Sequence, residues 1–497
     1  MADVVLVKFE PENEIHGFAP PFGILFLADA LEKAGFTVRL IHEVGSRSII
    51  ARLVEDVVRD KPLFVGFSSF TSSILLPTAA ASREIRRVSD VPIVWGGIHS
   101  TILPEQTLAN EFIDVICIGE GEETIVELAR SAGPDGWNLE TLRGIKGIGY
   151  HVDGRPVVNE FRPFLGDPDR FSPAWHLVDV GRYIYRRDHF YTQIGSRLQG
   201  QSIAAMITSR GCPWRCAYCY NQAVNRRSFR ARSASSVVAE IEFLKSRGAS
   251  TIIFEDDNFF GNKQRVLDIV RNVDVKWSST VRADYLAKWG EDFVAELSRR
   301  GCVEVRIGAE SGSPLVLGLM QKDITIEHIR RAVDLCARNG IQTLLNFMVG
   351  VPGETWNDVL ATLALMDDLE ANYDNVSIGS PAVYIPWPGT ELSQEAARRG
   401  FEAPDTLEGW ATYWAQRADP APYQDRRIMF IGFYKSLLRR DFRGVPFPFL
   451  ARQLQRFARL RWRKRFFSFP LDYHVPAFFL RSLRHLGLRR FALALYQ

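Results

Sequence analysis

The segment from Gly211 to Cys219 reads Gly-Cys-Pro-Trp-Arg-Cys-Ala-Tyr-Cys and decides how the rest of the chain is interpreted. Its thiols, Cys212, Cys216 and Cys219, are three of the six cysteines of the chain. Thiolates bind zinc, copper(I) or iron–sulfur clusters, and closed sites of the zinc or cubane type normally use four protein ligands. Neither a second C-x-x-C pair nor a nearby histidine supplies the fourth ligand. The spacing therefore indicates a metal site with one open position.

Two other interpretations of the three loop cysteines are a disulfide pair and an incomplete zinc knuckle. A disulfide would leave one odd thiol and needs an oxidising compartment. The loop resembles the cluster loop of the radical S-adenosylmethionine enzymes, in which three thiolates hold a [4Fe–4S] cluster and the open iron binds the amino and carboxylate groups of S-adenosylmethionine. The resemblance implies that the loop cysteines are cluster ligands. Cys117 and Cys336 are interpreted as small buried hydrophobes, and Cys302 opens a predicted barrel strand. None of the three has another cysteine at metal-ligand spacing, so we expect no second cluster.

Length and composition are those of a multidomain globular protein. The chain has 497 residues, of which 46% are hydrophobic and 24% charged, so we expect two to four domains. Residues 1–5 lack the basic and apolar regions of an export signal, and we expect a location in the reducing cytoplasm. An uncharged run over residues 64–82 contains Gly66 and Pro77. It is more typical of strand, turn and helix than of a membrane span.

Strand and helix patterns alternate over residues 1–135. Short apolar runs of the kind buried in parallel sheets lie at residues 4–7, 37–41, 63–67, 92–95 and 115–118. Helical patterns lie between them at residues 23–34, 48–59 and 72–87. The alternation predicts a doubly wound, Rossmann-like α/β domain, with its ligand beyond the carboxyl ends of the strands.

Several turns that follow these strands carry a candidate cofactor site. Glycine in such turns lets the backbone approach a ligand or take positive φ. The set and its spacing resemble the cobalamin-binding domain in front of the radical domain in class B, cobalamin-dependent radical S-adenosylmethionine enzymes, and the resemblance covers almost all of residues 1–130. It implies that these residues bind cobalamin: Pro20, Ser68, Ser69, Thr71, Gly96, Gly97, His99, Gly119 and Gly121.

The sequence differs from classical cobalamin domains at the motif that supplies the lower axial ligand of cobalt. Classical cobalamin domains use an Asp-x-His-x-x-Gly motif, whereas the nearest string here is Glu-Ile-His-Gly-Phe-Ala at residues 14–19. We expect cobalamin without a histidine lower ligand, as the class B resemblance implies, and interpret His16 as a loop residue. The alternative is a domain that keeps the fold but binds no corrin.

A connection and a second α/β domain follow. Residues 136–203 are predicted to be a linker with a hairpin over residues 149–158, around the Asp153-Gly154 turn. From residue 204 to 390, six strand–helix units predict an open, partial TIM barrel. Polar aromatic residues of the linker are interpreted as an interdomain surface: Tyr183, Tyr185, His189 and Tyr191.

Polar groups follow the barrel strands at their carboxyl ends, which form the catalytic face of a βα barrel. Glu255, Asp256, Asp257 and Asn258 come directly after the apolar run 251–254. The family resemblance implies three sets of S-adenosylmethionine contacts: Glu255 and Asp256 at the amino group, Glu310 and Ser311 near the ribose and methionine, and Gly350 and Pro352 beside the adenine. Asp257 and Asn258 fit turn caps equally well.

The C-terminal part is strongly basic. Residues 423–497 hold 17 Lys and Arg against 3 Asp and Glu, a net charge of +14, although the whole chain carries only +3. This break predicts a separate, mainly helical module over residues 391–497. Arginines alternate there with aromatic and aliphatic residues over 452–469 and again over 478–486. A cap packed on the barrel and peripheral contact of residues 423–497 with the inner face of a membrane are equally favoured, and nucleic acid less so.

These features predict a cobalamin-dependent radical S-adenosylmethionine C-methyltransferase acting on a small or hydrophobic metabolite. The resemblance implies a 5′-deoxyadenosyl radical, methyl transfer from methylcobalamin, and an electron donor such as flavodoxin or ferredoxin. One alternative is radical cyclisation or carbon–carbon coupling on a lipid or tetrapyrrole-like substrate, as in the anaerobic magnesium-protoporphyrin cyclase type. The other is a non-catalytic cobalamin or metal sensor with a nucleic-acid-binding tail. The sequence does not identify the substrate.

Overall fold

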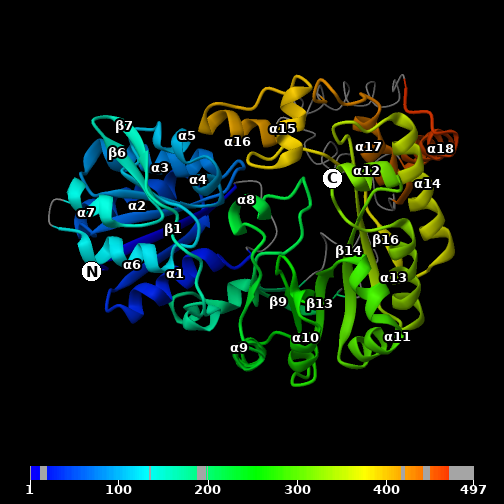
Figure 1. Cartoon of the computed structure of the whole chain (residues 1–497), viewed down its shortest axis with the longest axis horizontal. Helices are drawn as coiled ribbons and strands as arrows, with labels where there is room; N and C mark the ends of the chain where they lie inside the picture. Colours follow the sequence, from blue (N-terminus) through cyan, green and yellow to red (C-terminus); the bar gives the residue numbers. More distant parts are fainter. Residues whose placement is uncertain are drawn as a thin grey trace.

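The protein consists of two α/β units that lie side by side, with helices of the C-terminal part along one edge (Figure 1). The computed structural model describes residues 2–11, 19–133, 136–186, 198, 200–415, 420–439 and 448–468. His16, His189, Tyr191 and the basic stretch 478–486 lie outside the described residues. The predicted fold class, a doubly wound domain followed by a partial barrel, is confirmed.

The first unit is a seven-stranded sheet in the order β2-β1-β3-β4-β5-β6-β7. Its first five strands are parallel: β1 (Val4–Glu10), β2 (Val38–Val44), β3 (Phe64–Ser69), β4 (Ile93–Gly97) and β5 (Val115–Cys117). Alternate side chains of β1 enter different cores, Val5 and Val7 on one face and Val4 and Leu6 on the other, because successive strand residues point to opposite faces. Helices therefore cover both faces: α1 (Phe22–Lys33), α2 (Arg47–Asp60), α3 (Leu75–Val88), α4 (Ile98–Ile102), α5 (Pro104–Leu108), α6 (Glu122–Ser131) and α7 (Leu139–Gly144).

The hairpin predicted within the linker belongs to this sheet. Its strands, β6 (Ile148–Val152) and β7 (Arg155–Val158), pair antiparallel around a turn in which Asp153 and Gly154 both have positive φ. β6 also pairs antiparallel with β5, since Ile148 and Tyr150 are buried in the core of the first unit. The first sheet consequently continues beyond residue 135, and the connection starts after Val158.

The second unit is an open sheet in the order β16-β15-β14-β13-β12-β9-β8. Six strands are parallel: β9 (Ser202–Met206), β12 (Thr251–Phe254), β13 (Lys276–Val281), β14 (Cys302–Glu310), β15 (Gln342–Val349) and β16 (Val376–Ile378). The linker strand β8 (Ile184–Arg186) adds an antiparallel edge. The helices between the parallel strands are α8 (Asn221–Asn225), α9 (Ala234–Ser246), α10 (Lys263–Val270), α11 (Ala283–Arg299), α12 (Pro314–Leu319), α13 (Ile326–Arg338) and α14 (Trp356–Asn372).

Two barrel strands have other limits than the sequence predicts, which are residues 206–208 for the first strand and 377–384 for the last. The first ends at Met206, so Thr208 lies in the loop that leads to the cysteines. The last is divided into β16 and a short β17 (Ala382–Val383), which pairs with β15 farther along. Both differences lengthen the loops at the carboxyl edge of the barrel.

The C-terminal helices do not form one separate body. After α15 (Glu391–Arg398), α16 (Leu407–Ala415) packs on the first unit, where Leu407 and Trp410 share a core with α2 and α3. By contrast, α17 (Ile428–Arg439) and α18 (Pro448–Lys464) pack on the barrel core. The predicted boundary at residue 391 therefore does not delimit an independent module. Among the described helices, none is long and apolar enough to cross a membrane.

Candidate active site

The cysteine loop follows β9 and the short strand β10 (Ser209–Arg210) at the carboxyl edge of the barrel. Gly211 has φ +75°, and a Cβ there would lie 2.0 Å from the carbonyl oxygen of Ser228, so this turn requires glycine. The backbone N–H of Ala217 donates to the carbonyl of Met320 at 2.8 Å. The loop is thus folded against the segment that follows α12.

The donor chemistry of this loop fits an iron–sulfur cluster. Its thiols are all free, with Cys216 buried and Cys212 and Cys219 partly exposed, so the disulfide interpretation is not supported. Burial raises the pKa of Cys219 to about 12, and metal binding would displace these protons. In the described ranges no three His, Cys, Asp or Glu side chains converge as a preformed metal site. The assignment of an iron–sulfur cluster to this loop rests on its three thiol donors.

Two buried cations flank the cysteine loop. The Arg282 guanidinium lies 3.7 Å from the Cys216 sulfur, donates to the Lys322 carbonyl at 2.6 Å, and stacks 3.7 Å from the Trp214 ring centroid. The Lys322 ammonium donates to Tyr218 and Glu310, each at 2.9 Å. Arg282 follows β13. Its position after a barrel strand was the only feature of the sequence that could have indicated a place in the site. No sequence feature indicated that Lys322 belongs to the site, because its partners Tyr218 and Glu310 come from distant segments.

The carboxylates after β12 separate into two roles. Asp256 is buried, and its Oδ1 accepts hydrogen bonds from Thr208 and from the Ser209 hydroxyl. Burial raises its pKa to about 6. Glu255 and Asp257 instead line a cavity that also borders the first unit, and Asp257 accepts from the Gly211 N–H at 3.1 Å. Glu255 thus lies on the cavity wall, where its carboxylate accepts from Arg306 at 3.0 Å. Asp256 instead braces the loop before the cysteines.

The remaining residues expected near S-adenosylmethionine lie at the ends of β14 and β15. Glu310 adopts φ +62°, and its Oε1 accepts from the Tyr218 hydroxyl at 2.9 Å, which brings it to the cysteine loop. Ser311 is buried and bonds Thr362. Gly350, at φ +82°, precedes the buried Pro352 and donates its N–H to Glu354. Burial raises the pKa of Glu354 to about 7.

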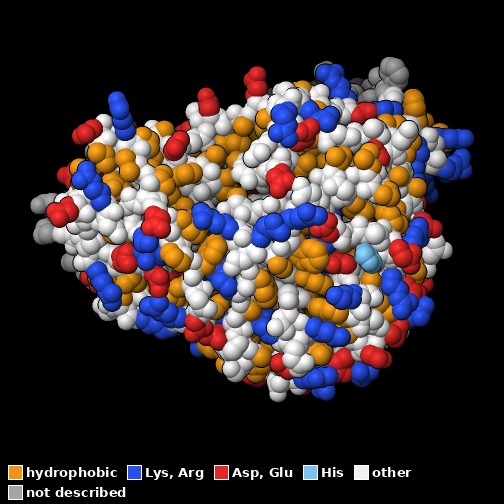
Figure 2. Space-filling view, in the orientation of Figure 1, with side chains coloured by type: hydrophobic (Ala, Val, Ile, Leu, Met, Phe, Trp, Pro, Cys, Tyr) orange, Lys and Arg blue, Asp and Glu red, His pale blue; other side chains and the backbone are white. Residues whose placement is uncertain are grey.

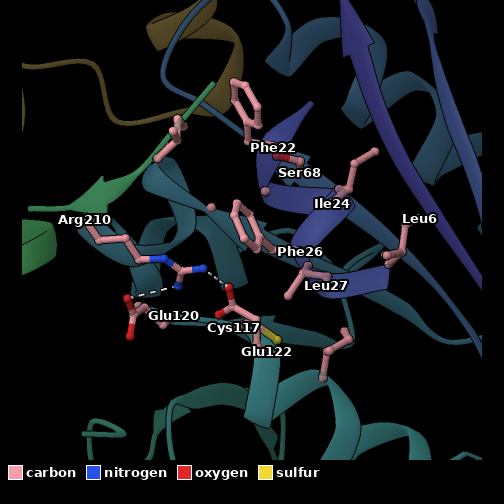
Figure 3. A pocket seen from close by; sticks show the side chains of 18 of the residues that line it. Leu6, Phe22, Ile24, Phe26, Leu27, Ser68, Cys117, Glu120, Glu122 and Arg210 are labelled. Atoms are coloured by element: carbon pink, nitrogen blue, oxygen red, sulfur yellow. Dashed lines mark hydrogen bonds and ion pairs between the residues drawn. The ribbon is translucent and has the colours of Figure 1, made fainter. Parts of the chain in front are cut away.

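A cavity of about 340 Å³ opens between the first unit and the segments that flank the cysteine loop, from which Ser209, Arg210 and Tyr220 line it. Figure 3 shows its wall from the first unit, with Phe22 and Phe26 of α1 near the ends of the strands. Five of the predicted cobalamin residues line it: Ser68, Gly96, Gly97, Gly119 and Gly121. Gly97 has φ +103°, and a Cβ there would lie 2.5 Å from the Ser69 carbonyl oxygen. Because four of these five lining residues are glycines, little side-chain bulk projects from this wall, which fits a large flat ligand such as a corrin.

Pro20, Ser69, Thr71 and His99 do not line this cavity. The Ser69 hydroxyl donates to the Gly96 carbonyl at 2.8 Å, and Thr71 bonds His99 Nδ1 at 3.0 Å. His99 is fully buried, its Nε2 has no hydrogen-bond partner, and burial lowers its pKa to about 4. The Ser69, Thr71 and His99 side chains thus form hydrogen bonds within the turns behind the cavity wall. The assignment of these residues and of Pro20 as cofactor contacts stays a prediction.

Ion pairs that the sequence did not predict join the two units at the cavity wall. Arg210, the residue before the cysteine loop, pairs with Glu122 and, at 3.1 Å, with Glu120 of the β5–α6 turn (Figure 3). Arg230 of β11 (Arg230–Ala231) also pairs with Glu120. Burial opposes ionisation of Glu120, but the two arginines hold its pKa below the ordinary value. The cysteine loop is thereby fixed to a glycine turn of the first unit.

Tyr183 of the linker also contacts the first unit. Its hydroxyl lies 2.9 Å from His42 Nδ1, and His42 Nε2 lies 2.8 Å from Glu10. All three side chains are buried. This contact agrees with the interpretation of the linker aromatics as an interdomain surface.

Comparison with known proteins separates the chain into the same two parts. Residues 13–129 match the B12 binding domain, and residues 206–366 match the Radical SAM superfamily. The anaerobic magnesium-protoporphyrin IX monomethyl ester cyclase of Rubrivivax gelatinosus is 29% identical over 77% of this chain and 67% of its own length. An uncharacterised methyltransferase of Pyrococcus horikoshii is 28% identical over 76% and 78%. The fold also resembles the radical S-adenosylmethionine methyltransferase TsrM from Kitasatospora setae, with TM-score 0.63, 22% identity and 85% coverage of each chain.

A partial barrel with a three-cysteine loop at its carboxyl edge defines a radical S-adenosylmethionine enzyme. The sheet in front of it carries glycine turns that fit a corrin. The chain belongs to the cobalamin-dependent radical S-adenosylmethionine enzymes, whose cofactors are a [4Fe–4S] cluster, S-adenosylmethionine and cobalamin.

Proposed function

We propose that the enzyme is a C-methyltransferase that acts on an unactivated carbon of a small or hydrophobic metabolite. The observation that carries this proposal is one cavity with walls from both units. Glycine turns of the first sheet form one side, and Glu255, Asp257 and Tyr220 of the barrel form the other. Cofactors held on the two sides would face the same space. The names of the Pyrococcus relative and of TsrM support methyl transfer.

We assign the cluster to Cys212, Cys216 and Cys219, and cobalamin to the glycine turns at Gly96, Gly97, Gly119 and Gly121. When bound, the cofactors supply one-electron chemistry and a transferable methyl group. Glu310 and Tyr218, which are hydrogen-bonded to each other beside the cysteine loop, would position S-adenosylmethionine. Glu255, on the cavity wall, would orient a polar group of the bound molecule.

The cavity walls support the exclusion of water from the reaction. Phe22, Phe26 and Leu27 of α1 line the cavity together with Ile125 of α6. Apolar walls keep solvent and stray hydrogen donors away from reactive carbon atoms. The Arg210 pairs with Glu120 and Glu122 hold the two sides at a fixed separation, as near-attack geometry requires.

A second candidate is radical cyclisation or carbon–carbon coupling. The Rubrivivax relative, named as a magnesium-protoporphyrin ester cyclase, favours it with 29% identity over 397 residues. Both candidates use the same cofactor sites and differ in the molecule placed between them. Detection of a methylated product distinguishes the two reactions.

Further proposals concern partners and location. An electron donor such as flavodoxin or ferredoxin would reduce the cluster, because the described residues supply no second set of cysteines at metal-ligand spacing. Six free thiols in the described ranges favour a reducing compartment such as the cytoplasm. The basic C-terminal part would bring the enzyme to the inner face of a membrane.

The test is anaerobic expression with cobalamin available, followed by measurement of corrin, iron and sulfide. Reduced protein is then incubated with S-adenosylmethionine and candidate metabolites. We expect stoichiometric corrin, 5′-deoxyadenosine and S-adenosylhomocysteine, and a methylated product. Cluster without corrin would overturn methyl transfer. An intact cluster with neither nucleoside product would favour the cobalamin or metal sensor.

A further inference from the structure

Helix α18 carries an unusual concentration of positive charge. Its 17 residues, Pro448–Lys464, include six Lys or Arg and no Asp or Glu. Five of the six basic side chains are exposed: Arg452, Arg456, Arg459, Arg463 and Lys464. Figure 2 shows Lys and Arg side chains gathered at the edge of the molecule where Figure 1 places α18. This edge is a strongly basic surface.

The same helix exposes large apolar side chains among its cations. The exposed fractions are 71% for Phe449, 56% for Phe457 and 47% for Leu460. Phe466, two residues beyond the helix, is 49% exposed. The described part of the protein exposes ten large hydrophobic side chains, and these four are among them. Exposed apolar side chains are therefore concentrated on this short segment and are not spread evenly over the surface.

The opposite side of α18 is anchored to the barrel. Ala458 and Trp462 are buried in the barrel core, and the Trp462 indole N–H donates to Asp367 of α14 at 2.9 Å. Arg465 pairs with the same carboxylate at 2.6 Å. The inner side of α18 therefore forms the cap on the barrel that the sequence favours equally with a membrane role. The outer side is exposed in the part of the chain that the structure describes.

We propose that the outer side of α18, defined by Phe449, Phe457, Leu460, Phe466 and the five exposed cations, docks on an anionic lipid bilayer. Cations next to phenylalanine and leucine match a surface of anionic headgroups above hydrocarbon. A nucleic acid would pair with the cations but offers no hydrocarbon in which Phe449 and Phe457 become buried. This inference deepens the membrane contact proposed above and is independent of the reaction.

Vesicle binding by the reconstituted full-length enzyme tests the proposal. We expect binding to vesicles of phosphatidylglycerol and phosphatidylcholine, little binding to phosphatidylcholine alone, and weaker binding at high salt. Replacing Arg456, Arg459 and Arg463 by Gln should weaken binding by about a hundredfold, because each cation near an anionic surface contributes roughly a fivefold factor. Replacing Phe449, Phe457 and Leu460 by Ser should weaken it to a similar degree.

Matched controls lie on the first unit. Arg52, Arg130 and Arg143 are exposed there, and their replacement by Gln changes the net charge equally. Val58, Leu76 and Val88 are 43%, 41% and 48% exposed and serve as the three sites for the serine control. Cluster content and melting temperature show that each variant is folded.

Two outcomes would overturn the proposal. One is equal vesicle binding by the α18 variants and their controls. The other is loss of duplex DNA binding in the arginine variant, with vesicle binding unaffected by the serine variant, which would assign the surface to nucleic acid. Because vesicle binding requires no turnover, a failure of methyl transfer leaves this test unchanged.

Discussion

The guanidinium Nη1 of Arg282 lies 3.7 Å from the Sγ of Cys216, and both side chains are buried. Arg282 is held in place by Asp284 at 2.9 Å, by the Lys322 carbonyl at 2.6 Å and by the Trp214 ring. An arginine is always charged in proteins. A fixed positive charge therefore lies beside a proposed cluster ligand.

Replacement of Arg282 by Gln should lower the reduction potential of the cluster. Reduction adds negative charge, and net charge and hydrogen bonds to the sulfurs set cluster potentials. At one fixed potential we expect about a tenfold lower ratio of reduced to oxidised cluster, or about 59 mV for a one-electron couple. Titration followed by electron paramagnetic resonance measures this shift. Arg271→Gln, at an exposed ion pair with Glu296, is the control, and equal potentials in both variants would contradict the prediction.

Alanine at Cys212, Cys216 or Cys219 should abolish the cluster, whereas alanine at the other cysteines should leave it. Cys117, Cys302 and Cys336 are buried, and none of them has another cysteine at metal-ligand spacing in the sequence. Iron and sulfide analysis after anaerobic reconstitution gives the readout. Loss of iron from the Cys302 variant at unchanged melting temperature would mean that the ligand set is misassigned.

Gly97→Ala should reduce corrin binding by about tenfold or more while the cluster remains. The new Cβ would lie 2.5 Å from the Ser69 carbonyl at φ +103°, so the turn must shift, and strain of this kind costs about 1–3 kcal/mol. Corrin absorbance and iron content are measured on the same sample. Gly144→Ala, where a Cβ meets nothing within 4 Å, should keep its corrin. Full corrin content in the Gly97 variant would exclude a close approach of cobalamin to this turn.

Stability of the corrin-free protein should fall on acidification because of His99. Burial lowers the pKa of His99 from 6.5 to about 4, so the unfolded chain takes up this proton first. The free energy of unfolding therefore keeps its full value, as far as His99 is concerned, above pH 6.5. It decreases as the pH falls toward 4, by about 3 kcal/mol in total. Unfolding midpoints measured across this range should vary less in His99→Gln. His176→Gln, at an exposed histidine paired with Glu32, should keep the full dependence, and parallel curves for the wild type and the His99 variant would refute the assignment.

Local sequence patterns predicted much of the fold. Apolar runs and helical patterns predicted the five parallel strands of the first sheet and the strand–helix units of the barrel, because strand burial and helix periodicity are local properties. The linker hairpin was also predicted from its Asp-Gly turn. Its membership of the first sheet was not, since pairing of β6 with β5 depends on burial of Ile148 and Tyr150 in a distant core.

For the site, the sequence alone determined the chemistry, because Cys212, Cys216 and Cys219 lie within one short loop and their spacing needs no tertiary contact. The sequence also located the carboxylates after β12, and the family resemblance gave Glu255 and Asp256 the same expected contact. It did not distinguish the different environments of the two side chains. Only the tertiary structure decided that Asp256 turns inward to Thr208 while Glu255 faces the cavity. It alone brought Arg282 to Cys216 and Arg210 to Glu120. Such contacts join residues far apart in the chain, and their energies depend on burial that no local pattern records.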